Sequence, residues 1–393
     1  MGRLTLAALQ NLVVYFVFYL LISTIAPYSS YVLKTSTGIS GLASGMFVIG
    51  ILFGRLATGA ISAKASPKKV LVPGNLAFAF LSSLYPMVRD PFSLIALRFL
   101  HGASFGVVHN ACGTIAAGVL PPSRRGEGIA YYSFGQIISA ALGPFLGLRF
   151  VASSDFRNVF LVAIGASFLS FGLSFTIPDL EKGSGDGRSR PHSLRLIEPS
   201  AVPVSVVIMV SGLAFSGIMA FLSMYGAEVH LSEATSQFFL VYAASVLMTR
   251  PLSGRMLDRW GARLVLPLCL SLFAMGLFAL AFAKSGPAVL LSALFIGLGY
   301  GNVLSLGQAE AVRRVPKELI ALATATYFVF LDIGAGLGPY LFGSLLPFLG
   351  YRSLYLLMGL MVLVLIPAYG GLLGLLGPKA RGPLETAQGP FKR

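Results

Sequence analysis

The sequence predicts an all-α protein that crosses a membrane many times, and three observations predict this fold class. Hydrophobic residues make up 56% of the 393 residues and charged residues only 11%, whereas a soluble chain carries about a quarter charged residues. Apolar runs recur along the whole chain, and the two halves of the chain repeat one another. The composition excludes a soluble or disordered chain. It also excludes a nucleic-acid-binding module, despite a net charge of +15.

Twelve transmembrane helices are predicted, because a hydrocarbon core about 30 Å thick needs roughly 20 residues of helix. They are centred near residues 8–28, 40–61, 69–88, 92–118, 127–149, 158–177, 203–226, 235–257, 263–283, 287–311, 320–346 and 352–376. The longest break between them, 178–200, is charged and rich in Gly, Ser and Pro, which is typical of a flexible linker. We therefore expect an amino-terminal six-helix bundle (1–180), a linker (181–200) and a carboxyl-terminal six-helix bundle with a short tail (201–393).

The distribution of lysine and arginine predicts the orientation of these helices. If the amino terminus is cytoplasmic, that side carries 20 of the 29 Lys and Arg residues and the opposite side carries six. Such an excess marks the cytoplasmic side of a membrane protein. Both termini and the linker are therefore expected in the cytoplasm of a cell whose inner or plasma membrane holds the protein. The net charge then reflects topology and contact with the lipid bilayer.

The internal repeat has an offset of 195 residues without gaps. It superimposes identical residues at Arg55 and Arg250, Gly59 and Gly254, Gly102 and Gly297, Tyr132 and Tyr327, and Gly143–Pro144 and Gly338–Pro339. One offset that holds from residue 55 to residue 144 predicts two pseudo-symmetric six-helix halves in parallel orientation. This architecture is typical of one large class of secondary transporters.

Several motifs in these halves resemble the major facilitator superfamily. Gly254–Leu266 (GRMLDRWGARLVL) matches the superfamily's loop signature, and Gly59–Leu71 (GAISAKASPKKVL) is its first-half copy. That copy has Ala63 where the superfamily has an acid and Ser66 in place of the second glycine. Two further segments are similar to its fourth-helix arginine motif and to the Gly-Pro bend of its antiporters: Arg98–Gly106 (RFLHGASFG), and Gly143–Pro144 with Gly334, Gly338 and Pro339.

Within the superfamily, RFLHG, PPSRRGEG and LDIGAGLGP look like the drug- and metabolite-efflux branch of arabinose-efflux-like permeases, which includes opine-metallophore exporters. The resemblance implies a monomeric proton-coupled antiporter that exports a small organic compound by alternating access. Uptake by a proton-coupled symporter, export of an opine-type metallophore, a facilitator and a transport-derived sensor are the alternatives. No phosphate-binding loop or metal-ligand spacing is found, and Cys112 and Cys269 lie in apolar runs. We therefore expect no enzyme, no cofactor and no metal.

Ionisable side chains inside predicted spans are the candidates for proton coupling, because charge is costly in a bilayer. Arg98, His101 and His109 recur on one face of the fourth predicted helix and are expected to form a polar stripe that faces the central cavity. The alternative is that Arg98 bonds to carbonyl groups and the histidines bond to neighbouring helices. Asp332 is the one acid deep in a predicted span, and it is expected to exchange a proton or contact substrate. The alternative is a structural hydrogen bond near the cytoplasmic half of its helix.

Substrate binding is expected from polar side chains within apolar spans, although each could instead join two helices. The candidates are Tyr19, Ser23, Arg55, His109, Asn110, Arg250, Tyr300, Asn302 and Ser305. For Arg55 and Arg250, reaching the cytoplasmic interface or clamping a loop is the favoured interpretation, and anchoring an anionic substrate group is the alternative. Other aromatic side chains, among them Tyr15 and Phe18, are expected mostly to face lipid or to pack.

Gating is expected from the loop motifs and from the Gly-Pro pairs. The candidates are Gly59, Lys64, Gly254, Asp258, Arg259, Arg263, Gly143, Pro144, Gly338 and Pro339. Asp258, Arg259 and Arg263 are predicted to form a cytoplasmic latch, because an acid at a helix end pairs well with basic residues or with a facing helix amino terminus. Gly59 and Gly254 are expected to be sites of close helix packing.

Overall fold

The computed structural model describes residues 2–62, 66–119, 125–177, 197–313, 315–316 and 319–375. Within these ranges every regular element is helical. The candidate gating residue Lys64, most of the predicted linker and the tail after residue 375 lie outside the described residues.

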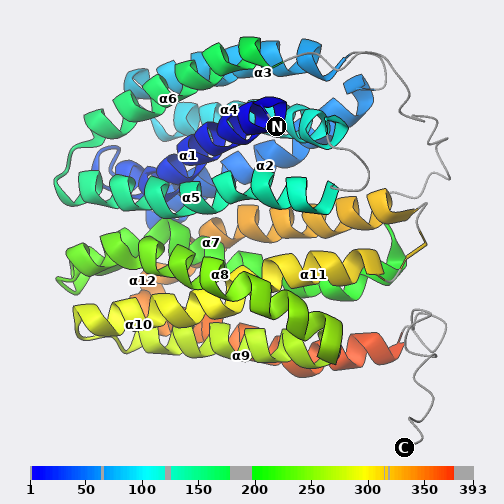
Figure 1. The fold of residues 1–393 in the computed structure, drawn as a ribbon. Helices are drawn as coiled ribbons and strands as arrows, with labels where there is room; N and C mark the ends of the chain where they lie inside the picture. Colours follow the sequence, from blue (N-terminus) through cyan, green and yellow to red (C-terminus); the bar gives the residue numbers. More distant parts are fainter. Residues whose placement is uncertain are drawn as a thin grey trace, which may run out of the picture.

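The amino-terminal half, residues 2–177, is built from long helices that run alternately in opposite directions (Figure 1). They are α1 (Gly2–Tyr31), α2 (Thr37–Ser62), α3 (Pro67–Ser83), α4 (Pro91–Gly118), α5 (Arg125–Ala152) and α6 (Phe156–Thr176), with a short 3-10 turn η1 (Tyr85–Met87) between α3 and α4. Asp90 and Asp155 begin α4 and α6 by accepting hydrogen bonds from the backbone N–H groups of Ser93 and Asn158.

The carboxyl-terminal half, residues 197–375, follows the same plan. It contains η3 (Pro199–Ala201), α7 (Val202–Glu228), α8 (Ser232–Trp260), α9 (Ala262–Ala281), α10 (Gly286–Ile296), the π-helical turn η4 (Gly297–Gly301), α11 (Asn302–Arg313) and α12 (Ile320–Leu375). Gly350 interrupts α12 with φ 69° and ψ 166°, a conformation that is open to glycine. The predicted spans 320–346 and 352–376 are therefore the two parts of α12, on either side of Gly350.

The helix boundaries repeat with the offset that identical residues predict. α8, α9 and α10 begin 195 residues after α2, α3 and α4, and α12 begins 195 residues after α5. Residues 286–313, which form α10, η4 and α11, correspond in the same way to α4. The repeat therefore concerns the arrangement of the helices along the chain as well as a few identical residues.

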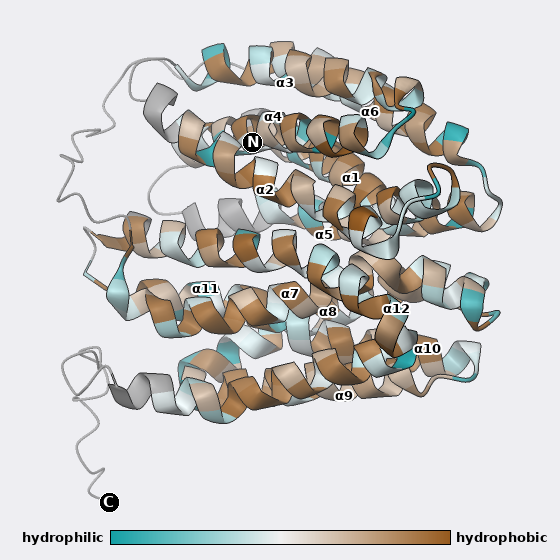
Figure 2. Cartoon of the chain, turned by 180° about the vertical axis from the view of Figure 1, so that it is seen from behind, coloured by the Kyte–Doolittle hydropathy of each residue, from teal (hydrophilic) through white to brown (hydrophobic). Residues whose placement is uncertain are grey.

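Ten helices of the described residues are long and apolar enough to cross a membrane, compared with the twelve spans predicted. The difference has two causes. α8 carries Glu233, Arg250, Arg255, Asp258 and Arg259 and is less apolar than the rest, and the two parts of α12 count as one helix. Hydrophobic residues occur along all the helices (Figure 2). Many large apolar side chains lie on the outside of the molecule: Phe92, Met248 and Phe348 are 81%, 81% and 85% exposed. A surface of this kind requires lipid around it.

Each half has its own apolar core. One core consists of residues between Ala7 and Ile177 only. The other extends from Ala201 to Tyr369 and includes four residues of the amino-terminal half, namely Ile22, Ala26, Val48 and Leu148. We call the end of the molecule where α1 ends and α2 begins the far end, and the end where α2 ends and α3 begins the near end. Ile22, Ala26 and Leu148 lie in the parts of α1 and α5 that lead to the far end, so the two halves pack together most closely there.

Backbone-to-backbone packing joins α2 and α12 toward the far end, and we call this contact the far-end seam. It consists of Gly38, Gly41 and Gly45 on α2 and Gly336, Pro339 and Gly343 on α12. A Cβ atom at Gly41 would lie 1.9 Å from the carbonyl oxygen of Pro339, and one at Gly45 would lie 2.0 Å from that of Gly336. The Thr37 hydroxyl donates a 2.6 Å hydrogen bond to the carbonyl oxygen of Gly343. Only glycine permits this approach.

Candidate functional site

A central cavity lies between the two halves, on the near side of the far-end seam. Its volume is about 130 Å³. The lining comes from α1, α2, α4 and α5 of one half and from α7, η4, α11 and α12 of the other. Because both halves contribute, a molecule held there contacts each of them.

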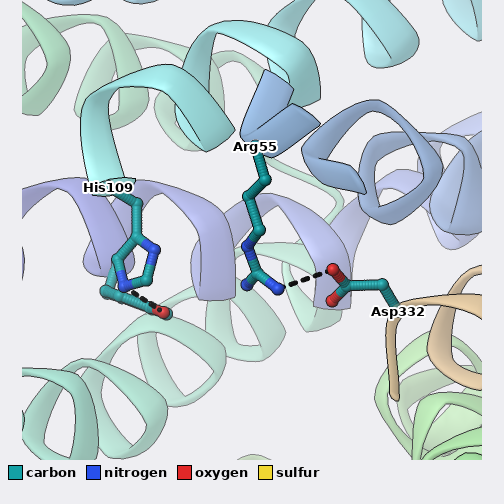
Figure 3. A network of polar contacts seen from close by, with 4 residues as sticks. Arg55, His109 and Asp332 are labelled. Atoms are coloured by element: carbon teal, nitrogen blue, oxygen red, sulfur yellow. Dashed lines mark hydrogen bonds and ion pairs between the residues drawn. The ribbon is translucent and has the colours of Figure 1, made fainter. Parts of the chain in front are cut away.

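An ion pair crosses this cavity. Arg55 on α2 donates from its Nη1 atom to the Oδ2 atom of Asp332 on α12 over 2.7 Å, between residues 277 apart in the chain (Figure 3). The Asp332 side chain is 5% exposed and that of Arg55 is 23% exposed. The Phe328 ring lies 5.2 Å from the guanidinium carbon, in cation–π geometry. Among the described residues that line the cavity, Arg55 and Asp332 carry the charge.

A second polar pair lies beside the first. The Nε2 atom of His109 on α4 is 3.1 Å from the hydroxyl of Tyr15 on α1. The imidazole is stacked on Phe105, with ring planes 11° apart and centroids 5.9 Å apart. Figure 3 shows the Arg55 side chain between His109 and Asp332. Groups that can carry a proton or a charge therefore come from both halves and meet at one cavity.

The predicted polar stripe is divided by the structure, and the expectation that all of it faces the cavity is wrong for Arg98 and His101. Both side chains are 0% exposed and lie inside the amino-terminal half. Arg98 donates to the carbonyl oxygens of Ala43 and Ser44 and to the Tyr85 hydroxyl, over 3.2, 3.2 and 3.3 Å. The alternative of carbonyl bonding therefore describes its contacts. The reason is that α4 packs tightly on α2, which directs these turns of α4 toward α2 and α3.

His101 continues this buried network. Its Nδ1 atom lies 3.0 Å from the Tyr85 hydroxyl and its Nε2 atom 3.0 Å from the Ser82 hydroxyl. The Ser82 and Ser167 hydroxyls are 2.7 Å apart. The network joins α3, α4 and α6 within one half. A role in proton coupling for Arg98 and His101 stays a prediction that their position does not support.

The candidate substrate residues fall into two groups. Tyr19 and Tyr300 line the cavity together with Arg55. The other six are outside its lining. His109 bonds to Tyr15, which belongs to the lining. Ser23, Asn302 and Ser305 bond within the helices: Ser23 donates to the carbonyl oxygens of Tyr19 and Leu20, Asn302 bonds to Thr249, Ser253 and the Leu298 carbonyl, and Ser305 donates to the Asn302 carbonyl. Asn110 and Arg250 are half-buried and also lie outside the lining.

Besides Tyr19 and Tyr300, the cavity has aromatic residues that the sequence did not predict there. Tyr15 and Phe18, which were expected to face lipid or to pack, both line it. Phe215 on α7 also lines it, stacked on Tyr300 with centroids 4.1 Å apart. The Arg55–Asp332 pairing was missed as well. Two opposite charges, each isolated in an apolar span, were the signal that could have found it, because a charge in a bilayer requires a partner.

The candidate latch residues Asp258, Arg259 and Arg263, all in the described range 197–313, do not contact one another as an ion pair in the structure. Asp258 and Arg259 lie in the last turn of α8 and Arg263 in the first turn of α9, and all three are exposed. Gly59 lies in α2. The expectation of close packing is wrong for Gly254, since a Cβ atom there would have no atom within 4 Å. The latch stays a prediction.

The Gly-Pro pairs occupy related places in the two halves. A Cβ atom at Gly143 on α5 would lie 2.8 Å from the Tyr19 Cβ atom on α1. One at Gly338 on α12 would lie 2.5 Å from the carbonyl oxygen of Leu213 on α7. Pro144 and Pro339 follow within their helices. Each pair therefore lies where a helix packs on the first long helix of its own half, and a gating role stays a prediction.

This arrangement defines a class of protein: a multi-pass membrane protein with a partly polar cavity between two repeated halves. Comparison with known proteins identifies the family. The family model of the Major Facilitator Superfamily matches residues 7–203 and again residues 204–392. The chain belongs to the Major Facilitator Superfamily, as the sequence motifs predicted, and it is a transporter rather than an enzyme.

Relatives and solved structures agree with this assignment. The chain is 25% identical over 334 residues to the multidrug resistance protein MdtG of Dickeya zeae (strain Ech586), covering 81% of each chain. It is 24% identical over 327 residues to an uncharacterized MFS-type transporter of Salmonella typhimurium (strain LT2), covering 81% of this chain and 82% of the other. The crystal structure of the nucleoside transporter NupG (D323A mutant) superimposes with a TM-score of 0.78 at 13% identity, over 94% of this chain and 99% of that one. This structural likeness concerns the fold alone.

Proposed function

We propose that the protein is a proton-coupled antiporter that exports a small organic compound by alternating access of the central cavity. The observation that carries the proposal is the Arg55–Asp332 ion pair, which joins the two halves across a cavity lined by both. The multidrug-resistance names of several relatives support export over uptake.

The proposed architecture has twelve spans in two six-helix bundles, with both termini and the linker in the cytoplasm. Two observations support the count: α8 is a 29-residue helix in the position of α2, and Gly350 divides α12 into parts that correspond to α5 and α6. One apolar core lies within residues 7–177 and the other lies mainly within residues 201–369, which supports the division into bundles. With this orientation the near end faces the cytoplasm, and the far-end seam closes the opposite side.

Proton coupling follows from what a nearly buried carboxylate requires. Asp332 is tolerated in an apolar site when it is paired with a cation or carries a proton. Arg55, a proton and a positively charged group of a substrate are therefore alternative partners of one carboxylate. A proton that enters from outside releases a substrate bound to Asp332, and loss of that proton to the cytoplasm restores the binding site. Competition of this kind gives antiport, because each ligand lowers the affinity for the other.

His109 and Tyr15 are proposed to bring the proton to the pair. Imidazole is the side chain whose charge changes in the physiological pH range. His109 bonds to Tyr15, which lines the cavity, and Arg55 lies between His109 and Asp332 (Figure 3). The movement of Arg55 away from Asp332 then opens a direct path between the histidine and the carboxylate.

The test is an untargeted comparison of small molecules inside and outside cells that lack the protein, overproduce it, or overproduce Asp332→Asn. We expect a compound that accumulates outside on overproduction and stays inside in the other two strains. Collapse of the proton gradient should abolish the difference. Arg157→Gln, which changes an exposed arginine at the start of α6, is the matched control. Depletion of a compound from the medium would favour symport instead, and export that Asp332→Asn leaves intact would contradict proton coupling.

A further inference from the structure

The aromatic lining of the central cavity defines a binding surface for a planar group. Among the 19 described residues that line it, seven are aromatic. On one side Phe215 and Tyr300 are stacked, with planes 15° apart. On the other side Tyr15 meets Phe105 edge to face, with centroids 5.1 Å apart. Aromatic side chains from both halves therefore enclose one space, where a planar ring gains offset-stacked and edge-to-face contacts.

Neutral polar groups are scarce in the same lining. They are Gln136, Ser216 and the hydroxyls of Tyr15, Tyr19 and Tyr300. The Tyr15 hydroxyl already bonds to His109, and the Ser216 hydroxyl already donates a 2.8 Å hydrogen bond to the carbonyl oxygen of Leu213. A ligand with many hydroxyl or amide groups would leave most of them without a partner in a mostly apolar site, which disfavours its binding. The lining thus disfavours sugars and peptides and favours a ring system with a few concentrated polar groups.

The ion pair specifies the charge of those polar groups, if the proposed antiport is correct. Arg55 and Asp332 together are neutral. An anionic ligand on Arg55 would leave an excess negative charge unless Asp332 takes up a proton, so ligand and proton would bind together. A cationic ligand on Asp332 would leave Arg55 unpaired. A zwitterion gives each member of the pair a new partner, keeps the site neutral and competes with the proton for Asp332.

The geometry of the pair fits a zwitterion whose charges lie close together. Arg55 Nη1 and Asp332 Oδ2 are 2.7 Å apart, so both charges face one small volume. Within the described residues, the guanidinium donates to Asp332 alone, and a guanidinium has five N–H donors. The edge of Arg55 that is not used by Asp332 can therefore accept a carboxylate in a forked pair.

We propose that the central cavity binds a planar aromatic zwitterion of one or two rings, with its ammonium group on Asp332, its carboxylate on Arg55 and its ring between the aromatic side chains of the two halves. The assignment rests on the proposed proton-coupled antiport and adds the chemical class of the substrate.

The test measures binding of four probes to the purified full-length protein by isothermal titration. Tryptophan, tryptamine and indole-3-propionate share one ring system and differ in charge, and leucine is a zwitterion without a ring. We expect tryptophan to bind at least about tenfold more tightly than each of the others, which corresponds to about 1.4 kcal/mol. Titration in buffers of different ionisation enthalpy should show that indole-3-propionate takes up protons. Tryptophan should leave the number of bound protons unchanged at a pH where Asp332 is ionised and paired with Arg55.

Two variants distinguish the proposed contacts from loss of folding, because each should change the preference rather than abolish binding. Asp332→Asn should bind indole-3-propionate at least as tightly as it binds tryptophan. Arg55→Gln should bind tryptamine at least as tightly as it binds tryptophan. Arg157→Gln should keep the wild-type order. A wild-type protein that prefers tryptamine, indole-3-propionate or leucine to tryptophan, or that binds none of the four, overturns the proposal. Gradient-driven export of another compound by such a protein would leave the proposed function standing.

Discussion

The two halves of the molecule share one backbone plan but differ in what lies inside them. The amino-terminal half buries the network of Ser82, Tyr85, Arg98 and His101. The residues 195 positions later are Leu277, Leu280, Ala293 and Ile296, which are all fully buried and apolar. The lengths and first residues of the helices therefore repeat in the carboxyl-terminal half, but this polar network does not. The comparison teaches that this fold needs the helix packing of each half but does not need a polar network at these four positions. The carboxyl-terminal half buries polar groups at other positions, such as Asn302 bonded to Ser253.

The same asymmetry shapes the central cavity. Two pairs of repeat-related residues line it, one member from each half: Phe105 with Tyr300, and Gln136 with Leu331. The charges do not follow the repeat. Arg250, the counterpart of Arg55, lies outside the lining, and the counterpart of Asp332 is Ile137. One half thus supplies the cation and the other the anion, and their pairing depends on how the halves are placed relative to each other.

Reversal of the ion pair is the strongest test of this division of charge, and the largest effect is expected there. Arg55→Asp or Asp332→Arg alone places two like charges across the cavity. Loss of a buried pair costs about 3–5 kcal/mol, so transport should fall at least about a hundredfold in each variant. The double variant should recover at least about tenfold over either single one, because an ion pair is restored. Export rates at matched protein levels are the measurement, and a double variant as inactive as the singles would argue against direct pairing.

Making the amino-terminal interior resemble the carboxyl-terminal one tests the buried network. His101→Ile removes one of two partners from each of the buried Tyr85 and Ser82 hydroxyls, which keep Arg98 and Ser167 respectively. The protein should therefore lose about 1–3 kcal/mol of stability. Thermal unfolding in detergent measures this loss. The fourfold change Ser82→Leu, Tyr85→Leu, Arg98→Ala and His101→Ile should be less destabilising than the single one, since the polar side chains of the network are removed together. Ser167, which loses Ser82, keeps its hydrogen bond to the Ala163 carbonyl oxygen. The pH profile of transport should stay unchanged in His101→Ile, and a shifted profile would restore the proton-coupling role.

A methyl group in the far-end seam should change the balance between access states. In Gly45→Ala, the Cβ atom would meet the Gly336 carbonyl oxygen and force α2 away from α12. We expect transport to fall about tenfold, as a shift of about 1.4 kcal/mol in the conformational equilibrium would produce, and spin-label distances between α2 and α12 to lengthen. Gly172→Ala is the matched control, because a Cβ atom there has no atom within 4 Å. Unchanged distances in Gly45→Ala would show that the far-end seam does not stabilise the conformation in which α2 and α12 are in contact.

The smallest expected effect concerns the repeat-related residues Asp90 and Ser285, which precede α4 and α10. The Asp90 side chain accepts from the N–H of Ser93 over 2.9 Å, whereas the Ser285 side chain makes no cap hydrogen bond. Asp90→Ala should therefore lower the unfolding temperature slightly and Ser285→Ala should not. Hydrogen bonds from Ser93 hold the pKa of Asp90 below its ordinary value of 3.8. The contribution of this cap should be complete above that value and lost as the pH falls through the lower, folded-state pKa. Equal unfolding temperatures at pH 7 would contradict it.

The fold could be predicted from the sequence to a large extent, and the pairing of side chains could not. Hydrophobic runs and the 195-residue offset specify helices, because both express the local requirement that a spanning segment be apolar. The direction of a side chain depends on which helix packs on that turn. Arg98, His101 and His109 lie on one helix face by periodicity, yet the contact of α4 with α2 directs Arg98 and His101 into one half and leaves His109 beside the cavity.

Residues that could serve two roles show the same limit. Arg55 stands one turn before Gly59, where a long side chain can reach the membrane interface, and nothing local distinguishes that from the pairing with Asp332 that the structure shows. Gly254 matches a family motif, but its packing depends on a neighbour that the sequence does not specify. Information of this kind belongs to tertiary contacts, and a single sequence expresses it only weakly.

The far-end seam has a consequence for the proposed alternation between access states. Apart from the hydrogen bond of the Thr37 hydroxyl to Gly343, its closest contacts are between main chains. The attraction at these contacts is mostly dispersion, which loses a quarter to a half of its strength over a gap of about 0.5–1 Å. Lipid also provides no hydrophobic force to draw the helices back together. A slightly opened seam therefore keeps little of the energy of a closed one. The glycines of α2 and α12 make the release of this side an all-or-none step rather than a gradual widening.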